Sequence, residues 1–217
     1  MRFHTVLFDL DGTLIDHLPA IHRCYAHTLP QLGLPTPGRE EVRRAIGGGL
    51  ENAMRHFVSE ADLPRALEIF RAYWDKTMLD GVSLMPGASE LLRALHAQGA
   101  SAAVLTNKHG PSSRRVCDHL GIRPLLRGVF GAQDTPWLKP DPRLTTHVLT
   151  TLGADPSTAC LVGDSPFDAD TAQRGGIHGF LVATGTHAAG DLRAAGAEQV
   201  YPDLSALARG AFGLELV

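Results

Sequence analysis

The chain has 217 residues, of which 44% are hydrophobic, and its formal charge is −3 from 20 basic and 23 acidic side chains. This content is ample for a buried core, and on length alone one or two domains are possible. No basic run or stripe stands out, so we expect neither nucleic acid nor an anionic membrane as a partner. A small anionic substrate is compatible with this charge, because a few placed cations can bind it.

The cysteines and the apolar runs indicate where the protein resides. Cys24, Cys117 and Cys160 lie in apolar or helical stretches without Cys-x-x-Cys spacing, which predicts buried, reduced thiols. The first residues, MRFHTVLFDLDGT, lack the apolar stretch of a signal peptide, and no apolar run is long enough to span a bilayer. We therefore expect a cytoplasmic protein; its oligomeric state stays unknown from the sequence.

Four short apolar runs are predicted to be buried parallel strands, because each is apolar on both faces. They cover residues 5–8, 102–105, 159–162 and 180–183. Apolar spacing and acidic residues suited to a helix N-terminus predict helices between them. These helices cover residues 88–97, 141–152 and 168–174. The alternation predicts an α/β fold, with a Rossmann-like, mostly parallel sheet and helices on both faces.

Residues 16–84 break this alternation, because they have helical patterns and no convincing strand. Between Leu63 and Trp74, apolar side chains at i, i+4, i+7 and i+11 form one face of a helix, and a shorter helix is expected over residues 51–58. We therefore expect a helical cap inserted after the first strand, with hinges near residues 15 and 85. The remaining catalytic core comprises residues 1–15 and 85–217.

The first strand is followed directly by an acidic motif, Asp9-Leu10-Asp11-Gly12-Thr13. Side chains at i and i+2 of an extended chain point to the same face, so both carboxylates can share one pocket. Such a pair suits a nucleophile and a general acid/base that protonates a leaving oxygen and later activates water. The alternative is a capped loop, but the buried strand before the motif favours a functional site.

A second acidic cluster lies in the segment GDSPFD, which contains Asp164 and Asp168. Magnesium is usually held by one or two carboxylates together with substrate phosphate and water. Asp9 and Asp164 would supply that pair from adjacent strand ends. Asp168 has two interpretations, support of the metal site or a capping box with Ser165.

A phosphate group near three carboxylates requires compensating cations and hydrogen-bond donors. Lys139 is the candidate cation, because the prolines around it restrict the backbone and can hold it in place. Thr106 and Asn107, at a strand end, could donate to phosphate oxygens.

Other patterns do not meet the requirements of known sites. Residues 185–190 have the glycine spacing of a P-loop but lack its Lys-Ser/Thr pair. His17, His22 and His27 are five residues apart, which turns them around a helix instead of aligning them as metal ligands.

With these motifs in place, the sequence resembles the haloacid dehalogenase superfamily, in its phosphoglycolate-phosphatase-like branch. FDLDGTLID resembles the first motif, LTNK the second, the KPDP around Lys139 the third and VGDSPFDAD the fourth, so the resemblance covers essentially the whole chain. The helical insertion resembles the cap of this branch. The resemblance implies a magnesium-dependent phosphomonoester hydrolase acting on a small phosphorylated metabolite, with 2-phosphoglycolate as one candidate.

The resemblance also implies catalytic roles for the matched residues. Asp9 would attack phosphorus and become an aspartyl-phosphate, and Asp11 would protonate the leaving alcohol and then take a proton from water. Lys139 would neutralise charge on Asp9 and the phosphoryl group. Thr106, with the backbone around Asn107, would hold that group.

The same resemblance implies how metal and substrate are bound. Asp9 and Asp164 through their side chains, and Asp11 through its backbone carbonyl, would bind Mg2+, with Asp168 orienting that shell. The loop formed by Gly47, Gly48 and Gly49 resembles the substrate loop of this branch, where exposed amides could bind a second substrate anion. The alternative for this loop is a flexible turn between two cap helices.

Several functions stay open within this reading. Asp11 disfavours a dehalogenase, which has no leaving alkoxide to protonate. A sugar phosphomutase, a pyrophosphatase and a nucleotide phosphatase are compatible with the same core. A catalytically silent binding protein on this fold is disfavoured, because Asp9, Asp11, Lys139 and Asp164 are all present.

Overall fold

The computed structural model describes residues 2–197 and 199–216. Its central sheet has six strands in the order β5-β4-β1-β6-β7-β8, and each pair of neighbours is parallel. The strands are β1 (Thr5–Phe8), β4 (Ser101–His109), β5 (Leu126–Ala132), β6 (Ala159–Gly163), β7 (His178–Val182) and β8 (Val200–Tyr201). The chain adds strands on one side of β1 and then on the other. Ligands bind beyond the carboxyl ends of strands at such a reversal.

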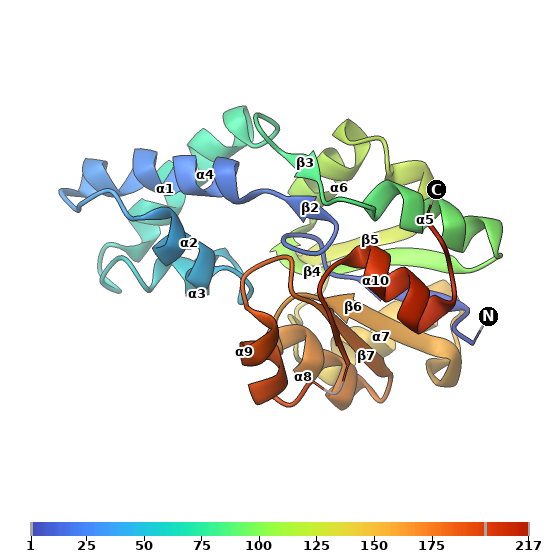
Figure 1. Cartoon of the computed structure of the whole chain (residues 1–217). Helices are drawn as coiled ribbons and strands as arrows, with labels where there is room; N and C mark the ends of the chain where they lie inside the picture. Colours follow the sequence, from blue (N-terminus) through green and yellow to red (C-terminus); the bar gives the residue numbers. More distant parts are fainter. Residues whose placement is uncertain (1, 198, 217) are drawn as a thin grey trace.

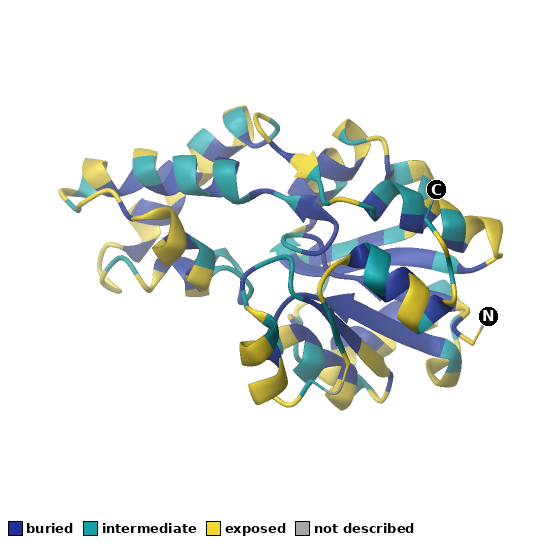
Figure 2. Ribbon diagram, in the orientation of Figure 1, coloured by how far each residue is buried: buried dark blue, intermediate teal, exposed yellow. Residues whose placement is uncertain are grey.

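Helices cover both faces of this sheet (Figure 1), which confirms the predicted fold class. Val6 and Val162 point to the face that is covered by α5 (Ala88–Ala97), α6 (Gly110–His119) and α10 (Leu204–Leu207). Leu7 and Leu161 point to the opposite face, which is covered by α7 (Pro142–Leu152) and α8 (Pro166–Gly175). Strands β1 and β6 and most of β4 are therefore buried on both sides (Figure 2), as their continuous apolar runs predict.

A second group of helices projects from one end of the sheet (Figure 1). It consists of α1 (Leu18–Thr28), a 3-10 turn (Leu29–Leu32), α2 (Arg39–Ala45), α3 (Leu50–Met54) and α4 (Leu63–Thr77). Their apolar side chains form a separate core around Tyr25, Phe70 and Trp74. The chain enters and leaves this group through two short antiparallel strands, β2 (Ile15–Asp16) and β3 (Ser83–Leu84). This arrangement supports our proposed division into a cap, residues 16–84, and a core.

The element boundaries differ from the predicted ones in ways that local chemistry explains. The predicted helix over residues 51–58 ends at Met54, because the following amides of His56 and Phe57 bond to carbonyls three residues back. β4 continues past residue 105 to His109. β5 is absent from the sequence prediction; it contains Gly128 and Gly131 and lies at the edge of the sheet, where its pairing with β4 outweighs low strand propensity.

The remaining elements are short. They are 3-10 turns at Arg123–Leu125 and Pro156–Thr158, α9 (Ala189–Ala194) and a π-helical turn at Ala208–Phe212. The three cysteines are buried free thiols, as predicted. Within the described ranges, every helix is too short or too polar to cross a lipid bilayer.

Candidate active site

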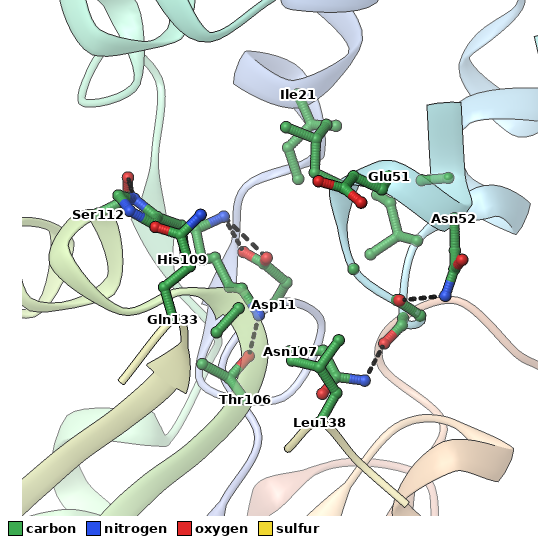
Figure 3. Close-up of a pocket in the computed structure, with 18 of the residues that line it drawn as sticks. Asp11, Ile21, Glu51, Asn52, Thr106, Asn107, His109, Ser112, Gln133 and Leu138 are labelled. Atoms are coloured by element: carbon green, nitrogen blue, oxygen red, sulfur yellow. Dashed lines mark hydrogen bonds and ion pairs between the residues drawn. The ribbon is translucent and has the colours of Figure 1, made fainter. Parts of the chain in front are cut away.

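The polar residues predicted to follow three strands lie together at the carboxyl ends of those strands. Asp9 directly follows β1, Asp164 directly follows β6, and Thr106 lies in the last part of β4. A cavity of about 570 Å³ opens there, between the strand ends and the cap. Figure 3 shows this cavity with Asp11 and Thr106 on its core side and Ile21, Glu51 and Asn52 on its cap side.

Lys139 connects two buried carboxylates. Its Nζ lies 2.8 Å from Oδ1 of Asp9 and 2.7 Å from Oδ1 of Asp168. Burial raises the pKa of Asp9 to about 6, although the nearby ammonium favours the ionised form. Burial opposes the charge on Lys139, but Asp168 and Asp9 outweigh this and hold the pKa of Lys139 above its ordinary range. Lys139 is therefore a fully buried cation that compensates this part of the site.

Asp164 is held by residues from two other loops. The backbone amide and hydroxyl of Thr186 donate to its Oδ2 at 2.8 and 3.0 Å, and the hydroxyl of Thr13 donates to its Oδ1 at 3.3 Å. Burial, with the charges of Asp9 and Asp168, raises the pKa of Asp164 to about 8. Gly12, which has φ = +84°, permits this approach, because a Cβ there would lie 2.7 Å from Oδ2 of Asp164.

Three carboxylates could share a cation. One oxygen from each of Asp9, Asp164 and Asp168 lies within 4.8 Å of the others, and all three residues are buried. Both oxygens of Asp168 already accept hydrogen bonds, Oδ1 from Lys139 and Oδ2 from the amide and hydroxyl of Ser165. The predicted capping box between Ser165 and Asp168 is therefore present at the start of α8.

The Asp11 side chain lines the cavity (Figure 3). Lys108 Nζ donates to both of its oxygens, at 3.1 and 2.8 Å. His17 approaches from the other side, with Nδ1 3.4 Å from Oδ1 of Asp11. Burial would raise the pKa of Asp11, but the Lys108 ammonium outweighs it and holds that pKa well below its usual range. In this state Asp11 is a carboxylate.

His17 is buried at the junction of core and cap. Its Nε2 lies 2.6 Å from the carbonyl oxygen of Met78, which can only accept, so Nε2 carries the proton. Burial lowers the pKa of His17. The spacing of the histidines in the sequence gives no sign that His17 contacts Asp11.

Thr106 and Asn107 differ in how many hydrogen bonds their side chains already make within the protein. Thr106 lines the cavity, and its hydroxyl accepts from the amide of Lys108 at 3.2 Å. The Asn107 amide group is used within the protein: it exchanges hydrogen bonds with the backbone of Lys139 and donates to the carbonyl of Gly47 at 3.1 Å. A phosphate contact from Asn107 would therefore use its backbone, as the family resemblance implies.

The glycine loop of the cap touches the core at this point (Figure 3). Gly47, Gly48 and Gly49 line the cavity. Phe167 packs against the loop so closely that a Cβ on Gly47 or Gly48 would lie 3.2 or 3.3 Å from its ring. Arg43, at the end of α2, donates from Nη1 to the carbonyls of Gly185 and Thr186 at 2.9 and 3.0 Å. The cap therefore rests on the core in this structure.

Sequence reasoning missed three contributors to the site. Lys108 is part of the LTNK motif, yet its pairing with Asp11 has no sequence signal, because the two lie 97 residues apart. Trp74 lines the cavity, although its spacing predicts only an apolar helix face. Thr186 lies in the segment that has the glycine spacing of a P-loop but lacks its Lys-Ser/Thr pair. It contributes one backbone amide and one hydroxyl, which both donate to Asp164.

Comparison with known proteins agrees with this geometry. Residues 6–182 match the family model of haloacid dehalogenase-like hydrolases. The phosphoglycolate phosphatase of Pseudomonas syringae pv. tomato is 32% identical over 220 residues, covering 97% of this chain and 80% of that protein. The phosphoglycolate phosphatase of Rhodospirillum rubrum is 32% identical over 213 residues, covering 93% of this chain and 88% of that protein.

A solved structure shows the same fold. The crystal structure of a predicted phosphoglycolate phosphatase from Haemophilus somnus superposes with a TM-score of 0.87 at 25% identity, covering 94% of this chain and 95% of that one. The chain therefore belongs to the haloacid dehalogenase-like hydrolase family, and it is a phosphatase of that family.

Proposed function

We propose that the protein is a magnesium-dependent phosphomonoesterase that transfers a phosphoryl group from its substrate to Asp9 and then to water. The observation that carries this proposal is the pairing of Asp9 with the buried ammonium of Lys139 beneath a cavity that Asp11 also lines. Phosphoryl transfer needs positioning and charge neutralisation more than covalent chemistry from the protein. A buried carboxylate with a fixed cation beside it meets both needs.

The residues at this site fit a magnesium ion. Magnesium prefers hard oxygen ligands, and the oxygens of Asp9, Asp164 and Asp168 lie within 4.8 Å of one another. Oδ1 of Asp168 is paired with the Lys139 ammonium and its Oδ2 accepts two hydrogen bonds from Ser165, whereas Oδ1 of Asp164 accepts only the 3.3 Å bond from Thr13. Asp9 and Asp164 are therefore the better side-chain ligands. We assign the third protein ligand to the backbone carbonyl of Asp11, and to Asp168 the support of this shell. Bound Mg2+ would neutralise charge on the transferring phosphoryl group.

The first chemical step joins Asp9 to phosphorus. A carboxylate oxygen of Asp9 attacks in line, the bond from phosphorus to the ester oxygen breaks, and Asp11 gives a proton to the leaving alcohol. The Thr106 hydroxyl and the backbone amide of Asn107 bind the transferring oxygens. Lys139 keeps Asp9 in place and offsets its charge.

The second step returns Asp9 to its starting state. Water attacks the phosphorus of the aspartyl-phosphate, Asp11 takes a proton from that water, and inorganic phosphate leaves. Lys108 holds Asp11 as a carboxylate in this structure, which is the form that accepts this proton. The acid role in the first step requires Asp11 to bind a proton when substrate is present.

The substrate we propose is a small phosphorylated metabolite, with 2-phosphoglycolate as the leading candidate. The support comes from the relatives named phosphoglycolate phosphatase, which match nearly the whole chain. The loop of Gly47, Gly48 and Gly49 faces the cavity and would contribute backbone amides to the part of the substrate beyond the phosphate.

Phosphate release from a panel of esters tests the proposal. The panel contains 2-phosphoglycolate, sugar phosphates, nucleotides and pyrophosphate, each assayed with Mg2+ and with a chelator. We expect Mg2+-dependent release that is strongest for one member, and no release from the Asp9→Asn variant. Equal release in the presence of the chelator would overturn the metal assignment. Failure to release phosphate from any member, by folded protein, would overturn the phosphatase assignment.

A further inference from the structure

Lys108 forms hydrogen bonds through its ammonium with Asp11 and with none of the phosphoryl-binding groups of the proposed reaction. It lies near the end of β4, two residues after Thr106, and its side chain lines the cavity and reaches Asp11. The ammonium donates to both Asp11 oxygens, at 2.8 and 3.1 Å, and the side chain is only 9% exposed. This two-point contact fixes where the Asp11 carboxylate lies and how it is rotated.

The cap holds Lys108 in turn. Its Nζ lies 4.6 Å from the ring centroid of Trp74, a residue of cap helix α4. The Trp74 ring is itself anchored on both sides of the junction: its Nε1 donates to the Ser112 hydroxyl of the core at 3.3 Å, and the His17 ring lies 4.8 Å away. A cation over an indole face is attracted by the ring, and more strongly when it is shielded from water.

We propose that Lys108 is a positioning residue for Asp11, and that Trp74 makes this positioning depend on the seating of the cap. The inference rests on the proposed function, in which Asp11 transfers a proton to the leaving oxygen. When the cap is seated, Trp74 supports Lys108 and Lys108 orients Asp11. When the cap moves away, Lys108 loses that support and Asp11 loses its fixed orientation. Proton transfer is thereby confined to the closed state, in which the substrate is enclosed.

The geometry favours this role over direct binding of a second anion on the substrate. An ammonium group has three N–H donors. In Lys108 two of them are directed at the oxygens of Asp11, and the ring of Trp74 covers a further side. A substrate carboxylate would have to break one of these contacts to reach Lys108.

The test compares leaving groups that do and do not need a proton. The assay measures kcat/KM, which reports the steps up to the transfer of the phosphoryl group to Asp9. The probes are 2-phosphoglycolate, 2-hydroxyethyl phosphate, which lacks the second anion, and p-nitrophenyl phosphate, whose phenolate leaves without protonation. We expect Lys108→Met to lower kcat/KM about 100-fold for both alkyl esters and less than about tenfold for p-nitrophenyl phosphate.

Two further variants separate positioning from a general loss of structure. Lys108→Arg retains a cation that can reach Asp11, so we expect it to recover a large part of the activity on the alkyl esters. Trp74→Leu removes the ring face, and we expect it to give the same leaving-group pattern as Lys108→Met with a smaller loss. Lys76→Met, at an exposed lysine of α4, is the matched control and should leave all three substrates unchanged.

Other patterns would overturn the inference. Equal losses on all three esters would mean that Lys108 supports the phosphoryl site or the fold. A loss confined to 2-phosphoglycolate would mean that Lys108 binds the substrate carboxylate. If Lys108→Met does not fold, Trp74→Leu decides, and a uniform loss in that variant refutes the proposal. Failure of the unaltered protein to hydrolyse any of the three with Mg2+ would instead refute the proposed function.

Discussion

The ammonium of Lys139 lies 2.8 Å from Oδ1 of Asp9, and both side chains are almost completely buried. An isolated buried charge is strongly unfavourable, so Asp9 depends on Lys139 for its ionised form, whereas Lys139 depends on both Asp9 and Asp168. The same pairing leaves Asp9 as a carboxylate held at a fixed point beneath the cavity. Stability and the proposed chemistry therefore depend on the same contact.

Replacement of Asp9 by Asn should abolish turnover and preserve the fold. Asn has nearly the same shape but cannot form the acyl-phosphate, so we expect phosphate release to fall by at least about 1,000-fold. Lys139 retains Asp168 as a partner at 2.7 Å. We therefore expect the melting temperature to stay within about 4 °C of the unaltered protein, roughly 1 kcal/mol for a chain of this size. Appreciable activity in a purified Asp9→Asn sample would contradict the nucleophile assignment.

Lys139→Met should destabilise the fold as well as the reaction. The change leaves Asp9 and Asp168 buried without their cation, and loss of one partner from such a cluster is expected to lower the free energy of unfolding by about 3–5 kcal/mol. Urea unfolding followed by circular dichroism measures this. Addition of Asp168→Asn should restore part of the loss, because it removes one of the stranded charges. A double variant no more stable than the single one would show that the charges are not the cause.

The fold was predictable because the strands that carry the site are buried on both faces. β1 and β6 are runs without a polar residue apart from Thr5, and the Asp9 and Asp164 that end them stand out against that background. The capping box of α8 was predictable for a local reason, since Ser165 and Asp168 are close in sequence, although the predicted helix starts at residue 168 and α8 begins at Pro166. Such signals depend only on neighbouring residues.

Contacts across the junction of cap and core have no such local signal. Trp74 has the spacing of an ordinary core residue, and only the packed structure places its ring against Lys108. Thr186 binds Asp164 mainly through the geometry of its backbone. The strand pattern of β5 cannot be recognised in the sequence, because the strand contains two glycines. One of them, Gly131, allows the backbones of β5 and Lys108 to approach closely.

Stabilisation by Mg2+ should increase with pH. Burial raises the pKa of Asp9 from 3.8 to about 6 and that of Asp164 from 3.8 to about 8 in the metal-free protein. The folded state therefore keeps protons that the unfolded chain releases, and this stabilisation is full below about pH 4 and lost as the pH rises through both folded values. Mg2+ competes with those protons, so we expect it to raise the melting temperature more at about pH 8 than at about pH 5.

Thermal melts with Mg2+ and with chelator at the two pH values measure this difference. At 100 times its dissociation constant, Mg2+ should raise the melting temperature by about 5–10 °C near pH 8. Asp164→Asn removes a proposed ligand and should lose most of the increase. An increase of the same size at both pH values, or one retained in that variant, would contradict the assignment of Asp164 as a ligand.

Arg43→Met should weaken Mg2+ binding although Arg43 does not reach the carboxylates. Its guanidinium donates to the carbonyls of Gly185 and Thr186, and Thr186 holds Oδ2 of Asp164. Removal of these bonds frees the loop that orients Asp164, and loss of such an outer contact typically weakens metal binding by about tenfold or more. The exposed ion pair with Glu40 contributes little.

Calorimetric titration with Mg2+ distinguishes this effect from the loss of positive charge alone. Arg44 is the matched control, because it follows Arg43 on the same helix and is exposed. We expect Arg44→Met to bind Mg2+ as the unaltered protein does, and Arg43→Met to bind it about tenfold more weakly. If both variants lost affinity equally, long-range charge would explain the change. If neither did, the loop at Gly185 would hold Asp164 without help from the cap, and seating of the cap would be independent of the metal site.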